Sequence, residues 1–198
     1  MVRVVLATHN RHKAAEFQQI LGDAVPGLEI VGYDGPEPVE DGVTFAENAL
    51  IKARAAAARS GLPALADDSG ICVDAMGGAP GIFSARWAGR HGDAEANLRL
   101  LLDQLADLPD GARAGHFTAT LALVTPEGAT TVVEGVWPGR IAREARGAHG
   151  HGYDPIFIPE GHEATAAELG PDAKNVESHR SRAFAAIVPA LRELVAAG

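Results

Sequence analysis

The sequence predicts an α/β protein, because apolar runs of strand length alternate with amphipathic segments of helix length. Val2 to Ala7 is an almost continuous apolar run typical of a buried strand, and Ala14 to Leu21 places Phe17, Ile20 and Leu21 at helical spacing. The 198 residues contain no linker, internal repeat or low-complexity tract, so we expect one domain over residues 1–198. The hydrophobic fraction of 46% is sufficient for a sizeable core.

The composition excludes several classes of protein. A net charge of −9 argues against a protein that binds long nucleic acid, because such binding requires a basic face. It allows a small anion to bind in a locally basic pocket. Cys72 is the one cysteine, so no disulfide and no cysteine-based metal site can form within the chain. The first residues lack a signal-peptide pattern and no apolar run is long enough to cross a membrane. We therefore expect a cytoplasmic protein that does not associate with membranes.

The segment between the first strand and the first helix is a candidate phosphate site. It consists of Thr8, His9, Asn10, Arg11, His12 and Lys13. A strand that leads into a helix N-terminus presents free backbone amides to an anion, and Lys13 lies where the helix dipole disfavours a cation. The alternative is that Asn10 is an ordinary N-cap and Lys13 a solvated charge. Because several anion-binding features coincide, we favour the phosphate site.

A weak second strand over Leu28 to Val31 precedes an acidic, proline-rich loop and a second helix that runs to about Arg59. Thr44 and Glu47 have the spacing of a capping box at the start of this helix. Lys52 follows Asn48 by four residues, so the two share a helix face, and on this stretch alone a solvated face is the favoured interpretation.

Two acidic segments are candidate metal ligands. Asp67, Asp68, Ser69 and Gly70 separate two apolar runs, and we expect a tight turn there with Gly70 at positive φ. Adjacent carboxylates repel unless a cation lies between them, and Mg²⁺ prefers carboxylate oxygen. An Asx-turn that only holds backbone amides is an equal alternative. Glu40 and Asp41, in the earlier loop, could complete a metal site, but on sequence alone simple exposure is the favoured interpretation of both.

The remaining elements follow in order. We expect a rigid glycine-rich loop over Met76–Gly81, an extended segment over Ile82–Trp87 and a helix over Asp93–Leu105. A hairpin of two strands follows over His116–Val124 and Thr130–Trp137. A short strand over Ile156–Ile158 and a final helix from His179 to about Leu194 complete the chain.

Two further segments carry candidate binding residues. In the glycine-rich stretch from 147 to 155, His151 and Tyr153 can flank a planar ring of a ligand. His149 and His151 could instead bind zinc, but this is disfavoured because no further His or Cys lies nearby in the sequence. His179 and Arg180 open the final helix, where the dipole disfavours cations, so anion binding explains them better than an exposed turn does.

Taken together, these motifs resemble the inosine/xanthosine triphosphate pyrophosphatase family over nearly the whole chain. The resemblance rests on Thr8-His9-Asn10 with Lys13, Thr44-Phe45 with Glu47-Asn48-Ala49 and Lys52-Ala53, Ala66 to Gly70, Gly77 to Gly81 with Ser84-Ala85-Arg86, Gly152 to Pro155, and Lys174 with Ser178-His179-Arg180. It implies a single elongated α/β domain with a long twisted mixed β-sheet flanked by helices, a central nucleotide-binding cleft and a homodimer.

The resemblance also implies roles for individual residues. Asp68 would be the proton acceptor and, with Glu40, a ligand of Mg²⁺. The triphosphate would be held by the segment Thr8 to Lys13, Lys52 and Ser69, and the base by His151, Gly152, Tyr153, Asp154, Lys174, His179 and Arg180. Two positions depart from the family pattern: His151 stands where Phe is common, and His9 stands where Gly or Ser is frequent.

The activity implied is hydrolysis of ITP, dITP and XTP to the nucleoside monophosphate and pyrophosphate, which would cleanse the nucleotide pool before incorporation into DNA or RNA. Two alternatives stay open. One is a pyrophosphatase for other modified nucleotides, with the same metal and phosphate groups but another base pocket. The other is a nucleotide-binding protein without catalytic activity, which the paired Asp67 and Asp68 disfavour.

Overall fold

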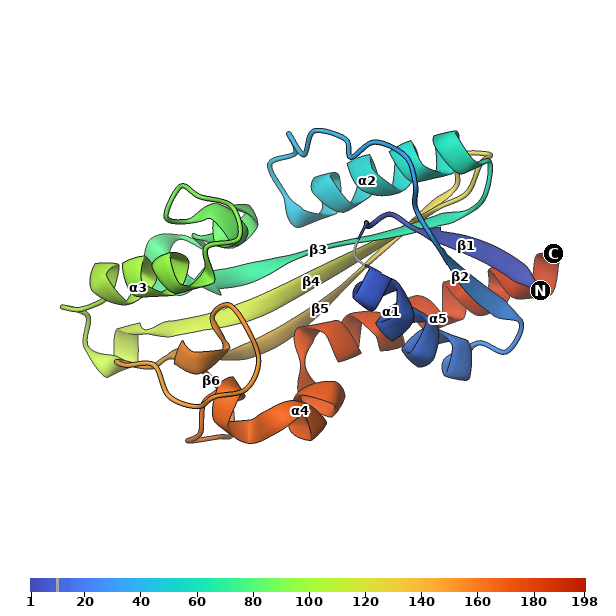
Figure 1. Ribbon diagram of the computed structural model, residues 1–198. Helices are drawn as coiled ribbons and strands as arrows, with labels where there is room; N and C mark the ends of the chain where they lie inside the picture. Colours follow the sequence, from blue (N-terminus) through green and yellow to red (C-terminus); the bar gives the residue numbers. More distant parts are fainter. Residues whose placement is uncertain (10) are drawn as a thin grey trace. The chain divides into compact units, whose positions relative to one another are not determined.

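The computed structural model describes residues 1–9 and 11–198, with side chains at all of these positions except 11–13, 16, 171–173 and 175 (Figure 1). The strands of the sheet are β1 Val2–Leu6, β2 Leu28–Gly32, β3 Ala64–Val73, β4 Ala114–Val124, β5 Thr130–Ile141 and β6 Phe157–Pro159. The α-helices of the described chain are α1 Arg11–Ala24, α2 Phe45–Ser60, α3 Ala94–Gln104, α4 Ala166–Glu177 and α5 His179–Ala197.

The strands form one mixed sheet in the order β2-β1-β3-β4-β5-β6. β1 is parallel to β2, with Val2 opposite Leu28, and parallel to β3, with Val5 opposite Ala64. β5 and β6 are antiparallel. Parallel neighbours require a crossover connection, and α1 supplies it between β1 and β2. The predicted α/β class with a mixed sheet is therefore confirmed.

The chain divides into two compact units. Unit 1 contains residues 1–68, 120–134 and 183–198, and unit 2 contains residues 69–119 and 135–182. Each unit has its own apolar core.

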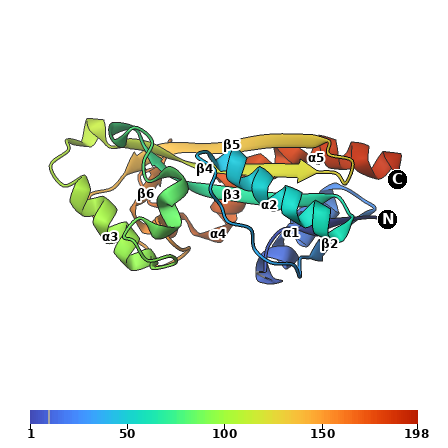
Figure 2. The ribbon, with the colours of Figure 1, turned by 90° about the horizontal axis from the view of Figure 1, so that it is seen from above.

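The core of unit 1 is built largely from alanine. Buried alanines of α2 pack on Ala64 and Ala66 of β3 and on Ala122 of β4, and the small side chains let the helix approach the strands closely. Figure 2 shows α2 lying over these strands. Phe17 of α1 meets Phe184 of α5 edge to face at a centroid distance of 4.7 Å. Phe17 and Leu21 are buried as predicted, but Ile20 is 38% exposed, so its expected inward position is wrong.

The core of unit 2 is aromatic. Phe157 of β6 lies edge-on to Phe117 of β4 at 4.7 Å and tilted against Trp137 of β5 at 5.3 Å. Leu101 of α3 and Ala166 of α4 belong to the same buried cluster. These contacts hold the strands and helices of unit 2 together.

The tight turn expected at residues 67–70 is wrong, because these residues lie inside the ten-residue strand β3. Gly70 is not among the glycines with positive φ. β3 is an inner strand with neighbours on both sides, and the two ladders outweigh the preference of Asp, Ser and Gly for turns. Successive strand residues point to opposite faces, so Asp67 and Asp68 are separated rather than paired.

The extended segment expected over Ile82 to Trp87 is also wrong, because Gly81–Arg86 forms a 3₁₀ helix. Ser84 holds this helix in place. Its Oγ accepts from the Ile71 amide at 2.9 Å and donates to the Gly81 carbonyl at 2.6 Å. Such side-chain bonds to backbone compete with strand formation.

Local capping places the starts of two helices. The Thr44 hydroxyl accepts from the Glu47 amide at 3.1 Å, and the Glu47 carboxylate accepts from the Val43 amide at 2.6 Å. Thr165 and Glu168 form a complete capping box at the start of α4. Within the described part of the chain, no helix combines the length and apolarity needed to cross a membrane.

Candidate functional site

Unit 1 holds a cluster of two carboxylates around one lysine. Lys52 Nζ of α2 lies 3.3 Å from Glu40 Oε1 and 3.6 Å from Asp68 Oδ1 of β3. The side chains of Lys52 and Asp68 are each only 16% exposed. The solvated face favoured for Lys52 from its local sequence is therefore wrong, since the lysine connects two acids from distant parts of the chain.

Burial raises the pKa of the Asp68 carboxyl above its usual value of 3.8. The positive charge of Lys52 and a hydrogen bond from Asn48 act against this increase, while the neighbouring charges of Glu40 and Asp67 add to it. Asn48 Oδ1 accepts from the Gly42 amide at 3.0 Å, which leaves its NH₂ group to donate. A buried carboxylate with raised proton affinity is suited to accept a proton from a bound water.

The same cluster fits a hard divalent cation. Carboxylates of Asp68 and Glu40 converge on a single positive charge, and both offer oxygen, the ligand that Mg²⁺ prefers. Among the residues that the structure describes, no three His, Cys, Asp or Glu side chains lie close enough to hold a metal ion. A cation here would thus use one or two protein carboxylates, with water and substrate oxygens as its other ligands, a pattern common for Mg²⁺.

The segment proposed for phosphate is described only in part. α1 begins at Arg11, three residues before the helix start expected at Ala14. Residue Asn10 and the side chains of Arg11, His12 and Lys13 lie outside the described part of the structure.

The ring of His9 is held by the loop after β2. His9 Nε2 lies 2.7 Å from the Gly35 carbonyl, and Nδ1 lies 3.2 Å from Glu37 Oε1. Its plane stacks on Tyr33 at a centroid distance of 5.8 Å and an angle of 8°. These contacts fix the side chain at the end of β1, beside the described start of the candidate phosphate segment.

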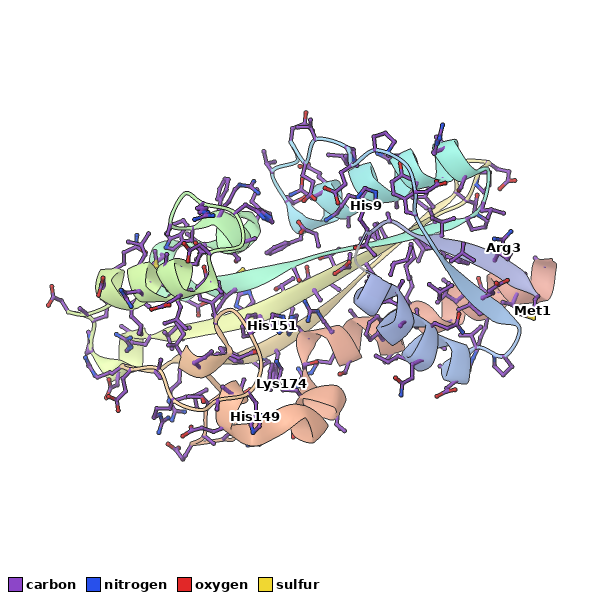
Figure 3. The ribbon with its side chains drawn as sticks, in the orientation of Figure 1. Met1, Arg3, His9, His149, His151 and Lys174 are labelled. Carbon is purple, nitrogen blue, oxygen red and sulfur yellow. The ribbon has the colours of Figure 1, made fainter. Side chains whose placement is uncertain are left out.

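Unit 2 contains a cavity of about 450 Å³. Its lining includes the eight predicted binding residues that belong to this unit, namely Ser69, His151, Gly152, Tyr153, Asp154, Lys174, His179 and Arg180. Figure 3 labels two of these residues, His151 and Lys174. The structure thus brings together residues that are up to 111 positions apart in the sequence, from Ser69 to Arg180.

One wall of the cavity is fixed by hydrogen bonds to backbone. The Tyr153 hydroxyl donates to the Ser84 carbonyl at 2.8 Å, and burial raises the pKa of this phenol. Asn97 of α3 donates to the Ala85 carbonyl at 3.1 Å and accepts from the Ala88 amide at 2.7 Å. These polar groups therefore shape the cavity and stay uncharged.

Other residues of the lining carry the charged groups. Asp154 Oδ2 accepts from Lys174 Nζ at 2.5 Å and from the His151 amide at 2.9 Å. The His179 ring lies against Phe117 at a centroid distance of 4.9 Å, inclined by only 12°. One face of the imidazole is thus covered by the phenyl ring.

Sequence reasoning missed Asn97 and Phe117 as lining residues. Phe117 has the pattern of a strand residue in the core, which gives no sign of a ligand. The sequence did contain a signal for Asn97, because this amide precedes Leu101 by four residues and therefore stands on the same helix face. In the structure both residues are buried, and Asn97 is 3% exposed. A buried polar side chain on an apolar helix face requires specific partners.

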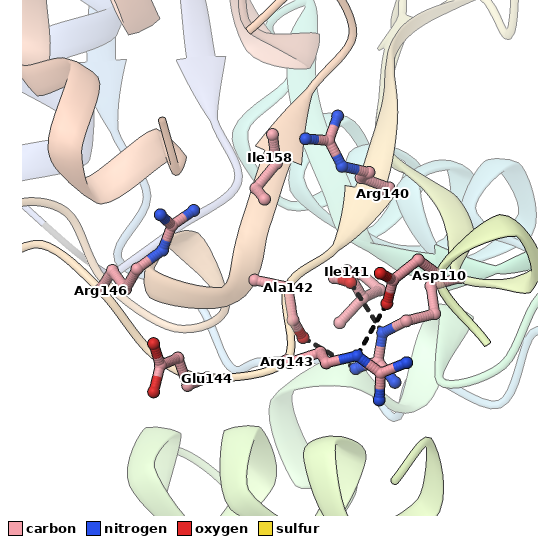
Figure 4. A pocket seen from close by; sticks show the side chains of 9 residues that line it. Asp110, Arg140, Ile141, Ala142, Arg143, Glu144, Arg146 and Ile158 are labelled. Carbon is pink, nitrogen blue, oxygen red and sulfur yellow. Dashed lines mark hydrogen bonds and ion pairs between the residues drawn. The ribbon is translucent and has the colours of Figure 1, made fainter. Parts of the chain in front are cut away.

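A second cavity of about 250 Å³ in unit 2 is lined by Arg113, Arg140, Arg143 and Arg146 (Figure 4). Their guanidinium groups already bind protein acceptors. Arg143 contacts Asp110 at 2.7 Å, and Arg140 contacts Glu163 at 2.8 Å.

Buried Arg113 donates to the carbonyls of Leu105, Ile141 and Ala142. The arginines of this cavity therefore hold loops together, and the larger cavity remains the candidate binding site.

Comparison with known proteins gives a consistent result. The sequence profile of the Ham1 family matches residues 4–190. The dITP/XTP pyrophosphatase of Leifsonia xyli subsp. xyli is 87% identical over 194 residues, which cover 98% of each chain.

Two solved structures agree with this match. A HAM1 protein from Coxiella burnetii has a TM-score of 0.90 at 42% identity, covering 98% of this chain and 100% of that one. A nucleoside-triphosphatase / dITP/XTP pyrophosphatase from Mycobacterium abscessus has a TM-score of 0.83 at 49% identity, covering 95% of this chain and 100% of that one.

Proposed function

Because the chain belongs to the Ham1 family, we propose that it hydrolyses ITP, dITP and XTP to the nucleoside monophosphate and pyrophosphate. The observation that carries this proposal is the 87% identity, over 98% of both chains, to a protein named dITP/XTP pyrophosphatase. The partly buried Lys52–Asp68 pair supports it, because the pair supplies a carboxylate of raised pKa beside a cation.

The cavity of unit 2 would bind the base. His151, Gly152, Tyr153 and Asp154 supply one side of it, and Lys174, His179 and Arg180 supply donors. Donors that face the 6-oxo group of a purine reject a 6-amino group, because donor then meets donor. This chemistry favours inosine and xanthosine over adenosine.

The triphosphate would be held by cations and backbone amides. Lys52 and Ser69 take part, together with the segment Thr8, His9, Asn10, Arg11, His12 and Lys13 at the N-terminus of α1. Lysines that approach phosphate oxygens neutralise charge that would otherwise repel a nucleophile.

Asp68 is proposed as the catalytic base. Its carboxylate would accept a proton from the water that attacks the α-phosphorus, and Lys52 would hold the carboxylate in place. The bond between the α-phosphorus and the bridging oxygen breaks, and pyrophosphate leaves with that oxygen. General-base catalysis of this kind contributes roughly 10²–10⁴ in rate.

Nucleotide pyrophosphatases generally need a divalent metal, and we propose Mg²⁺ held by Asp68 and Glu40. When bound, Mg²⁺ would neutralise charge on the phosphate oxygens and on the leaving pyrophosphate. Asn48, which bonds Asp68, would orient the carboxylate toward the cation.

We further propose that residues 1–198 act as a single nucleoside triphosphate pyrophosphatase domain in a cytoplasmic homodimer that cleanses the nucleotide pool. Size-exclusion chromatography with light scattering tests the dimer. A mass of one chain, 20.5 kDa, at micromolar concentration would contradict it.

The decisive experiment follows product release from a panel of triphosphates of inosine, deoxyinosine, xanthosine, guanosine and adenosine with Mg²⁺. We expect pyrophosphate and monophosphate in equal amounts from the first three and little from the last two. Equal rates with ATP and ITP would contradict the selectivity argument, and preference for another modified nucleotide would favour the alternative pyrophosphatase.

Replacement of Asp68 tests the mechanism. Asp68→Asn should abolish turnover and leave nucleotide binding measurable, whereas Asp103→Asn, which removes an exposed carboxylate at the end of α3, should keep wild-type turnover. Near-normal turnover by Asp68→Asn would refute the assigned role. Binding without any pyrophosphate release by the wild-type protein would identify a nucleotide-binding protein instead.

A further inference from the structure

We propose that the cavity of unit 2 prefers the ionised form of xanthine, so that near neutral pH the enzyme selects XTP over ITP. This inference rests on the proposed function and names the preferred member of its substrate class. It follows from the balance of charge and hydrogen-bonding capacity among the groups that line the cavity.

The ionisable side chains of the cavity carry an excess of positive charge. They are His151, Tyr153, Asp154, Lys174, His179 and Arg180. Lys174 and Arg180 are the basic side chains of this set, and Asp154 is its single carboxylate. Burial keeps Tyr153 neutral because it raises the pKa of the phenol. A protonated histidine would only add to the positive charge.

The one carboxylate of the cavity already has its donors. Asp154 is buried and accepts from both Lys174 Nζ and the His151 amide through the same oxygen. An ammonium group has three N–H donors, so Lys174 keeps donors beyond the one directed to Asp154. Ser84 and Asn97, which also line the cavity, hydrogen-bond to backbone groups of the protein. The charge presented to a ligand is therefore that of the cations.

Arg180 is the strongest element of this argument. Its Nε is buried, and within the described part of the chain it has no hydrogen-bond partner. No carboxylate among the described residues forms an ion pair with it either. A buried donor without an acceptor is costly, and the cost is larger when the donor belongs to a charged group. Because Arg180 lines the cavity, an anionic ligand there would stabilise the charge of its guanidinium group.

Xanthine is the purine that supplies such an oxygen. In a nucleoside, xanthine loses a ring proton close to neutral pH, and the negative charge spreads over N3 and the 2-oxo group. Hypoxanthine has no 2-oxo group and stays neutral in the same range, and guanine presents a 2-amino donor instead. Hydrogen bonds to an ionised acceptor are roughly twice as strong as those between neutral groups. The cavity should therefore rank ionised xanthine above hypoxanthine, and hypoxanthine above guanine.

The test compares two substrates on one enzyme. The ratio of kcat/KM for XTP to that for ITP is measured with Mg²⁺ from about pH 5 to about pH 8, across the ionisation of xanthine. Triphosphate binding, metal binding and the chemical step are common to both substrates and cancel in the ratio. We expect the ratio to rise by about fivefold or more, since one added charge near a cation is worth about 1 kcal/mol even in a water-like medium.

Arg180→Gln should flatten this rise, and Arg180→Lys, which keeps the charge, should retain most of it. Arg192→Gln is the matched control, because it removes the same charge from helix α5, where Arg192 donates to the Ala24 carbonyl. A ratio that is independent of pH in the wild-type enzyme, or a rise that is unchanged in Arg180→Gln, would overturn the inference.

A binding measurement separates this inference from the proposed function. Calorimetry with xanthosine and inosine monophosphates, without metal, should give tighter binding of xanthosine monophosphate at the upper pH only. This result would support the base preference even if neither triphosphate were hydrolysed, an outcome that would refute the pyrophosphatase proposal alone. Hydrolysis of both triphosphates with equal monophosphate affinities at both pH values would refute the base preference alone.

Discussion

Replacing Lys52 by methionine should increase the proton affinity of Asp68. Lys52 Nζ lies 3.6 Å from Asp68 Oδ1 and favours the ionised carboxylate, while burial and the charge of Glu40 oppose ionisation. Methionine has a similar length and no charge, so the substitution leaves both opposing influences in place and removes the compensating one. The pKa of Asp68 is therefore expected to increase further above its usual value.

The size of the effect follows from the distance. Two unit charges about 4 Å apart attract by about 1 kcal/mol in a water-like medium and by about 4 kcal/mol at an effective dielectric constant of about 20. The lower energy corresponds to an increase of about fivefold in the proton-binding constant of Asp68, and the higher one to more than about a hundredfold. Both partners are only 16% exposed, so we expect more than the lower value.

The assay is a carbon-13 NMR titration of side-chain carboxyl groups in metal-free protein. The Asp68 signal is identified by its absence in Asp68→Asn. Lys52→Arg, which keeps the charge, should titrate nearly as the wild type does. An Asp68 carboxyl that titrates at the same or lower pH in Lys52→Met would refute the reasoning, because it would mean that Lys52 does not stabilise the ionised form.

Four other outcomes are expected. The pKa of Asp68 is higher in the folded than in the unfolded protein, so ionisation of this carboxyl favours unfolding. In the metal-free protein, the free energy of unfolding should therefore decrease as the pH rises from about 3.8 through the folded pKa. Urea unfolding of Asp68→Asn should show no such decrease. Tyr153→Phe should lose about 1 kcal/mol of stability in urea unfolding, because the bond to the Ser84 carbonyl is lost, and an unchanged midpoint would contradict this role. Thr165→Ala should cost about 1 kcal/mol by removing the cap of α4, whereas the exposed Thr130→Ala should cost little in the same measurement. Chelation of divalent ions should stop pyrophosphate release and added Mg²⁺ should restore it, so that turnover in excess chelator would argue against the metal site.

Elements with a strong local signal could be predicted from the sequence. β1 and α1 follow from hydrophobic periodicity, and the start of α2 follows from Thr44 and Glu47 at capping spacing. The strand β3 shows the limit of this approach. Asp67 to Gly70 favour a turn locally, but ladders on both sides of an inner strand decide the conformation, and the local sequence does not contain them.

The candidate site was predictable where motifs identify it and unpredictable where partners are remote. The cavity gathers Tyr153, Asp154 and Lys174 as their motifs imply. The environment of Lys52 could not be read from α2, because its two acidic neighbours come from a loop twelve residues earlier and a strand sixteen residues later. Similarly, the residues that contact His9 follow β2, and they cannot be predicted from the sequence around His9.

Arg113, a residue outside helix α3, caps the C-terminus of this helix with a charged group. The last turn of α3 has no basic residue, and the helix is followed by Leu105, whose carbonyl receives a guanidinium N–H from Arg113. A cation at this position also complements the negative end of the helix dipole. Because the same side chain bonds the carbonyls of Ile141 and Ala142, the termination of α3 depends on the end of β5 being in place. A peptide that carries α3 alone should therefore fray at its C-terminus, and lysine, without a forked guanidinium, should be a poor substitute at position 113.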